Sequence, residues 1–179
     1  MRSIVGALIG CLICGSALAQ GAPYAGQQDR DIKALSSQEE ADLLAGRGMG
    51  LARAGELNHY PGPSHVLELR DRLGLTAQQG ENVRASFDRM TASAKPLGRE
   101  LVERERRLDA GFRDALITPA TVGVLTGEIA AIQGRLRAVH LAAHVEMHSL
   151  LTPDQIATYD KLRGYGDNVP AAPVGHMHR

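Results

Sequence analysis

The sequence predicts an all-α protein built around a long antiparallel helical hairpin, with a leading helix and short corner helices. Two observations predict this fold. The helix-forming residues Ala, Leu, Arg and Glu dominate the middle of the chain, and no segment alternates apolar and polar residues as a half-buried strand does. The pattern Leu-Thr-x-x-Gln also occurs twice, over residues 75–79 and 151–155, and each copy is typical of a helix start.

Each copy of this pattern has the spacing of a capping box. Thr76 stands at an expected N-cap position, with Gln79 three residues later. The same spacing recurs at Thr152 and Gln155, where Pro153 suits the first helical position because a missing N–H there costs no hydrogen bond. In a capping box, the threonine and glutamine side chains satisfy each other's otherwise unpaired backbone N–H groups. Both boxes therefore predict helices that begin at these points.

Four more elements follow from local signals. Residues 20–35 are polar and contain Gly and Pro, which predicts a flexible leader. Acidic residues after Ser36 and Ser37 predict a leading helix from residue 38 to about residue 58, weakened by the glycines at 46, 48 and 50. After the break at residues 60–63, Ser64 is expected to cap a short helix from residue 65 to about residue 73. The second Leu-Thr-x-x-Gln box predicts a helix from residue 154 to about residue 163.

Two long segments carry apolar residues at alternating steps of three and four, which indicates two helices that face each other. The first begins at Thr76 and is expected to kink at Pro96 and to close near Gly111. The second begins at Thr118 and runs to about Leu150. Because few residues join them, we expect them to fold back as a hairpin. The apolar positions are Val83, Phe87, Met90, Ala94, Leu97, Leu101 and Leu108 in the first segment, and Val122, Leu125, Ile129, Ile132, Leu136, Val139 and Ala143 in the second.

The N-terminus has the features of an export signal. Arg2 precedes an apolar stretch over residues 4–13, and Ala17-Leu18-Ala19 supplies the small residues of a cleavage site. Residues 1–19 are therefore predicted to be a signal peptide, which places the mature protein in the periplasm. An alternative is a lipoprotein signal with Cys11 as the lipidated residue. Under simple cleavage both cysteines are removed, so the mature chain has no thiol.

Composition and motifs exclude several function classes. The chain has 20 basic and 20 acidic residues, only 3% aromatic residues and no Trp, which argues against a nucleic-acid partner. The sequence contains no His-Glu-x-x-His helix and no recognisable nucleophile turn, so we expect no enzyme activity. The expected organisation is one helical domain over residues 36–165, followed by a disordered histidine-containing tail over residues 166–179.

The paired Leu-Thr-x-x-Gln boxes in an exported helical chain resemble the signature of the Spy/CpxP-like periplasmic chaperones and their heavy-metal-resistance relatives. The resemblance implies a hooked-hairpin fold, a homodimer with a concave face, and no required cofactor. It also implies either a metal-responsive envelope stress protein or an ATP-independent chaperone that shields unfolded clients. A membrane-bound signalling partner belongs to the same expectation.

Three histidines carry the more specific hypothesis. His140, His144 and His148 recur every four residues, so neighbouring pairs lie one helical turn apart. Each step of four rotates by about 40°, so all three cannot converge on one ion. The predicted site is therefore one adjacent pair, completed by Glu146, Met147 or a group from another helix. The resemblance also points to Met147, because metal-sensing members of the family use histidines and a methionine before the second corner.

The metal itself is left open among zinc, nickel, cobalt and copper, because imidazole ligands suit several of these ions. His176 and His178 in the tail would add a weak second site. The alternative interpretation is structural. His140 flanks the apolar seam and fits a packing role, while His144 and His148 fit a solvated surface.

Overall fold

The computed structural model describes residues 22–165, and these residues form six helices and no strand. The all-α prediction is confirmed. The signal peptide predicted over residues 1–19 and the histidine-containing tail over residues 166–179 lie outside the described residues. Within the described part of the chain, no helix is both long enough and apolar enough to cross a membrane.

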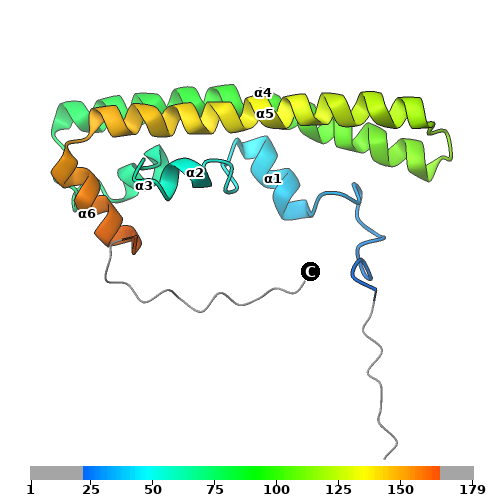
Figure 1. Ribbon diagram of the computed structural model, residues 1–179, viewed down its shortest axis with the longest axis horizontal. Helices are drawn as coiled ribbons and strands as arrows, with labels where there is room; N and C mark the ends of the chain where they lie inside the picture. Colours follow the sequence, from blue (N-terminus) through cyan, green and yellow to red (C-terminus); the bar gives the residue numbers. More distant parts are fainter. Residues whose placement is uncertain (1–21, 166–179) are drawn as a thin grey trace, which may run out of the picture.

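Two long helices form the upper layer of the molecule in Figure 1. They are α4 (Ala77–Arg113) and α5 (Pro119–Leu150), and they make the most extensive contact in the structure. The pairs Arg89–Glu146 and Arg135–Glu100 show that the two helices run antiparallel, since the residue number rises on α4 as it falls on α5. The shorter helices α1 (Ser37–Ala45), α2 (Arg53–Glu56), α3 (Pro63–Glu68) and α6 (Pro153–Arg163) lie below this pair.

Both predicted capping boxes form. The backbone N–H of Gln79 donates to Thr76 Oγ1 over 3.1 Å, and the backbone N–H of Thr76 donates to Gln79 Oε1 over 3.1 Å. The corresponding distances for Thr152 and Gln155 are 3.2 and 3.0 Å. Further boxes cap α1 at Ser36 and α5 at Thr118. Local side chains therefore satisfy donors at the N-termini of all four of these helices.

The two glutamines of these boxes also bind each other, which the sequence does not predict. Gln79 Nε2 donates to Gln155 Oε1 over 2.9 Å, and Gln155 Nε2 donates to Gln79 Oε1 over 3.1 Å. Gln79 Nε2 also lies 3.0 Å from the backbone oxygen of Leu150, at the end of α5. This amide pair joins the start of α4 to the start of α6.

The prediction of one leading helix from residue 38 to about residue 58 is wrong. Helix α1 ends at Ala45, and Gly46 takes the left-handed conformation with φ 72°. Met49 and Gly50 also have positive φ, so the chain turns before the four-residue helix α2. In a sequence pattern, glycine reads only as a weak helix former. Here Gly46 and Gly50 adopt positive φ, and Gly46 ends the helix.

The predicted cap of the next helix is also wrong. Helix α3 begins at Pro63, one residue before Ser64, and Gly62 is its N-cap. The Ser64 hydroxyl instead donates to Glu68 Oε1 over 3.3 Å. Proline has taken the first helical position, where its fixed φ is favourable and its lack of an N–H costs nothing. Turns continue from the end of α3 to Gly74, which has φ 60°.

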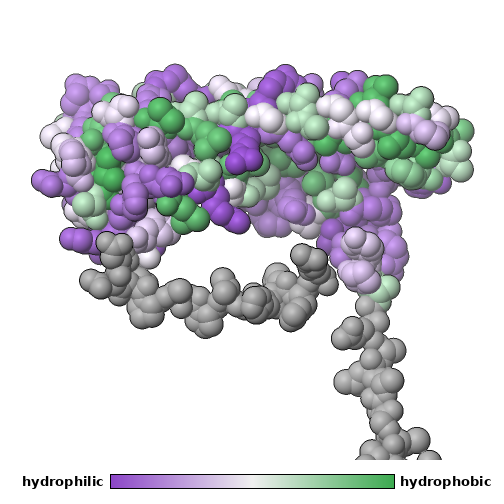
Figure 2. All heavy atoms as spheres, viewed as in Figure 1, coloured by the Kyte–Doolittle hydropathy of each residue, from purple (hydrophilic) through white to green (hydrophobic). Residues whose placement is uncertain are grey.

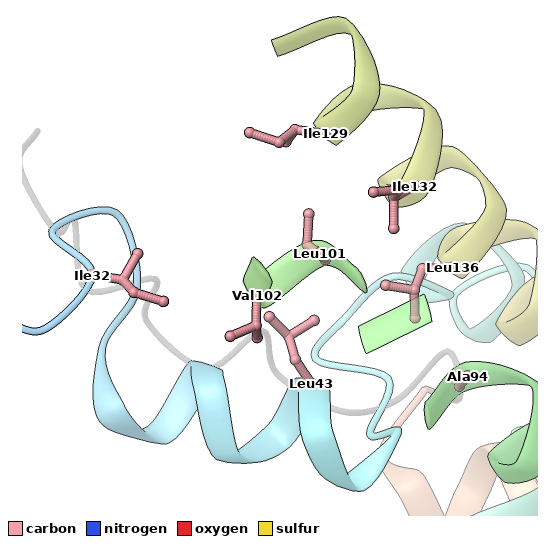
Figure 3. Packing of buried hydrophobic residues seen from close by; sticks show 8 residues of the cluster. All are labelled: Ile32, Leu43, Ala94, Leu101, Val102, Ile129, Ile132 and Leu136. Atoms are coloured by element: carbon pink, nitrogen blue, oxygen red, sulfur yellow. The ribbon is translucent and has the colours of Figure 1, made fainter. Parts of the chain in front are cut away.

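Buried apolar residues form two clusters along the long helices. The first joins the predicted seams of α4 and α5 to α1 and to Ile32 of the leader, as Figure 3 shows. The second lies at the corner where α3, α4, α5 and α6 meet. The first cluster contains Ile32, Leu43, Ala94, Leu101, Val102, Ile129, Ile132 and Leu136, and the second contains Val66, Leu73, Val83, Met147, Leu151 and Tyr159.

Candidate functional site

A cavity of 640 Å³ lies between the long helices and the segment that carries α2 and α3. His140 and His144 of α5 line it, together with residues of α4 and of the segment 45–65. The i,i+4 spacing places the two imidazoles on one side of α5, one turn apart. Both are buried, with 2% and 9% of their surface exposed.

Two glycines allow the backbone of this segment to lie against the rings. A Cβ added at Gly48 would lie 3.4 Å from His140 Nδ1, and a Cβ added at Gly62 would lie 3.0 Å from His144 Cε1. Larger residues at these positions would press on the rings. The glycines therefore let the segment 48–62 cover both histidines closely.

His140 is buried without a partner for one of its nitrogens. Its Nε2 has no hydrogen bond to any group in the described part of the chain. Burial, with a smaller effect from the nearby His144, holds the pKa of His140 below the ordinary histidine value. Burial therefore favours the neutral form of the ring, in which one nitrogen has a lone pair.

His144 is held by a backbone oxygen. Its Nδ1 lies 2.8 Å from the carbonyl oxygen of Tyr60 and 3.7 Å from Glu56 Oε2. Because a carbonyl only accepts, Nδ1 carries the hydrogen and the lone pair of the neutral ring is on Nε2. Metal-binding histidines commonly have this arrangement, in which the far nitrogen donates to a carbonyl or carboxylate and fixes the ring.

Glu56 is the centre of a polar cluster that sequence reasoning missed. Its Oε1 accepts hydrogen bonds from the hydroxyls of Tyr159 over 2.6 Å and Tyr165 over 3.2 Å, and it lies 3.5 Å from Arg163 Nε. Burial and the bond to Glu56 raise the pKa of Tyr159 far above its ordinary value. These partners are about a hundred residues away in sequence, so no local signal could have found them. The cluster ties α2 to α6 beside His144.

The structure does not bring the other predicted ligands to this cavity. Glu146 accepts from Ser86 Oγ over 2.7 Å and from Arg89 over 2.6 Å. Met147 is completely buried in the second apolar cluster, and the His148 ring stacks on Tyr60 with centroids 4.3 Å apart. His176 and His178 lie outside the described residues.

The site is therefore a pair of buried histidines on α5 over a cavity that His65 of α3 also lines. Over residues 22–165, no group of three or more His, Cys, Asp or Glu side chains is arranged to hold a metal ion. Any ion bound by His140 and His144 would need water or another type of ligand to complete its coordination.

The fold and the site define an all-helical protein in which a covering segment encloses a buried histidine pair. Comparisons with models of known protein families, with curated proteins and with solved structures find no match for this chain.

Proposed function

We propose that this protein is a periplasmic, non-catalytic envelope protein of the heavy-metal response, which binds a transition metal ion through His140 and His144. The observation that carries the proposal is the state of these two side chains. Each ring is buried beside the same cavity, and a nitrogen of each has no hydrogen bond within the described part of the chain. Residues that only fill a core do not need such a cavity beside them.

Other features are consistent with this role. The paired Leu-Thr-x-x-Gln boxes and the predicted signal peptide resemble those of the Spy/CpxP-like and heavy-metal-resistance proteins. The long hairpin with α6 turned at its end is the arrangement that a hooked-hairpin protein of this type would have. A homodimer and a membrane-bound signalling partner belong to the same proposal. Cleavage of the predicted signal peptide removes both cysteines, so the mature chain has no thiolate ligand for a divalent ion. Imidazole is then its principal side-chain ligand for a transition metal.

Isothermal titration calorimetry with zinc, nickel, cobalt and copper tests the site. We expect the mature protein to bind at least one of these ions at a single site, and we expect His140→Ala/His144→Ala to abolish that binding. His59→Ala is the matched control, because His59 lies outside the cavity and contacts Asp160 over 2.8 Å.

The double alanine variant removes two buried rings, so its fold must be checked by circular dichroism. If it unfolds, His140→Leu/His144→Gln preserves most of the side-chain volume, and glutamine can still donate to the Tyr60 carbonyl. Undiminished binding by a folded variant would refute the site, and binding of no ion by the wild type would refute the proposed function.

A chaperone function is the second candidate, and one observation favours it. Large apolar side chains are exposed at the end of the hairpin where α4 and α5 join, and Figure 2 shows hydrophobic residues gathered there. Phe112, Leu116 and Val124 are 61%, 79% and 61% exposed. An exposed apolar patch of this kind is typical of a surface that binds another protein, such as an unfolded client.

A further inference from the structure

The wall of the cavity beside the histidines has more positive than negative side chains. Three arginines line it, Arg47, Arg53 and Arg163, whereas Glu56 is the only carboxylate of the described residues that does so. Glu56 already accepts hydrogen bonds from two tyrosines and lies 3.5 Å from Arg163. An excess of positive charge around a concave site favours the binding of small anions.

Arg53 is the arginine of this wall whose charge has no partner within residues 22–165. Arg47 pairs with Asp42 over 2.6 Å, and Arg163 lies beside Glu56, but no acidic side chain is within ion-pair distance of Arg53. A Cβ added at Gly50 would lie 3.3 Å from Arg53 Nη2, so the guanidinium rests on the glycine turn that lines the cavity. Because Arg53 is exposed, its charge stands where a ligand can reach it from solvent.

Large apolar side chains form another part of the same wall. Phe87 and Met90 come from α4 and are partly buried, and Leu57, directly after α2, is 56% exposed. The apolar part of a ligand that covered these side chains would remove their surface from water, which is favourable. The cavity volume of 640 Å³ also lies within the range of about 300–1,000 Å³ that is typical of small-molecule sites. The wall therefore suits a molecule with one anionic end and an apolar body.

We propose that the cavity binds a small organic monocarboxylate, with its carboxylate against Arg53 and its apolar body against Phe87 and Met90. The planar guanidinium can donate two parallel hydrogen bonds to a carboxylate. One unpaired guanidinium matches one negative charge, whereas a phosphate monoester carries about two at neutral pH and would leave one without a cation. The inference goes beyond the proposed function, because it needs no metal ion and does not use His140 or His144 as ligands.

Isothermal titration of the metal-free mature protein with octanoate tests this site. We expect octanoate to bind at a single site, and Arg53→Gln to weaken its binding by about tenfold, because the variant loses a charge-assisted contact. Arg47→Gln is the matched control, since Arg47 lines the same cavity but is already paired with Asp42, and it should change the affinity by less than about threefold. Octanol has the same apolar chain without the charge, so it should bind the wild type more weakly than octanoate does. Octyl phosphate should bind no more tightly than octanoate.

Three results would each overturn the inference: equal octanoate affinity in the wild type and a folded Arg53→Gln, octanol binding as tight as that of octanoate, or tighter binding of octyl phosphate. The comparison of the three ligands uses the wild type alone, so it remains decisive if the variant is destabilised. Phe112→Ser/Leu116→Ser should bind octanoate as the wild type does, and loss of binding there would assign the ligand to the exposed end of the hairpin instead. Binding of metal ions without binding of octanoate overturns this inference alone, and the converse result overturns the proposed function alone.

Discussion

At the scale of single residues, one glycine sets how closely α1 and α4 approach each other. Gly98 of α4 is buried against the backbone of Leu43 in α1, and a Cβ added there would overlap the Leu43 carbonyl oxygen. The neighbour is backbone and cannot move aside as a flexible side chain could. The contact between α1 and α4 therefore requires glycine at this position.

We expect Gly98→Ala to lower the free energy of unfolding by about 2 kcal/mol, because it forces the two helices apart. Gly80→Ala in the same helix is the control, since no atom lies within 4 Å of its added Cβ. It should stabilise the protein by about 0.5–1 kcal/mol through helix propensity. Urea denaturation of both variants checks this, and equal effects would show that α1 does not pack against α4 as described.

The lowered pKa of His140 leads to a second prediction at the residue scale. Its pKa in the folded protein lies below the ordinary value of 6.5, so the unfolded chain takes up this proton more readily. Its contribution to stability is complete above about pH 6.5 and declines as the pH falls toward the lowered pKa. In metal-free protein, the loss of unfolding free energy between about pH 7 and pH 5 should be smaller in His140→Leu than in the wild type. Urea denaturation at several pH values measures this, and identical pH profiles would contradict it.

At the scale of elements, the caps and seams are the features that the sequence predicted best. Capping at Thr76 and Thr152 depends on residues three positions apart, and the facing seams depend on steps of three and four along one helix. The break after Ala45 was missed because glycine is compatible both with a weak helix and with a left-handed helix end. Only the packing of the segment 46–62 on α4 and α5 decides between the two.

A double-mutant cycle on Gln79 and Gln155 measures how much their amide pair stabilises the corner where α4 and α6 begin. Each single alanine substitution should cost about 1–2 kcal/mol, because it removes a capping bond and leaves the partner amide without its hydrogen bond. The double variant should lose less than the sum, with a coupling of about 1 kcal/mol. Thermal or urea unfolding measures the cycle.

The control for that cycle combines Gln79→Ala with Thr118→Ala, which removes the cap at the other end of the hairpin. These two substitutions should be additive, since the sites share no partner. Additivity in the Gln79–Gln155 cycle as well would show that the amide pair contributes nothing to the corner.

At the scale of the whole molecule, one layer of long helices supports a second layer of short elements, and the cavity lies between them. Sequence reasoning found His140 and His144 because their spacing is local. It missed Glu56, because only tertiary folding brings the segment 45–65 to the same cavity as α5. In the folded structure, Met147 is buried in the second apolar cluster. Its position in the sequence near the second corner did not indicate this.

The exposed apolar residues at the end of the hairpin allow a test of the proposed chaperone function. Phe112→Ser/Leu116→Ser removes two exposed apolar side chains and should leave the melting temperature nearly unchanged. If this surface binds clients, the variant should suppress aggregation of a denatured protein less well than the wild type, in the absence of ATP. Equal suppression by both would exclude this surface as the client site.

The most direct test of the metal-binding account is a set of crystals soaked in turn with zinc, nickel, cobalt and copper, with anomalous data collected at the absorption edge of each metal. The account predicts an anomalous peak in the cavity, within bonding distance of a nitrogen of His140 and a nitrogen of His144. Maps with no peak there for any of the four metals, or with peaks confined to other surfaces, would contradict it.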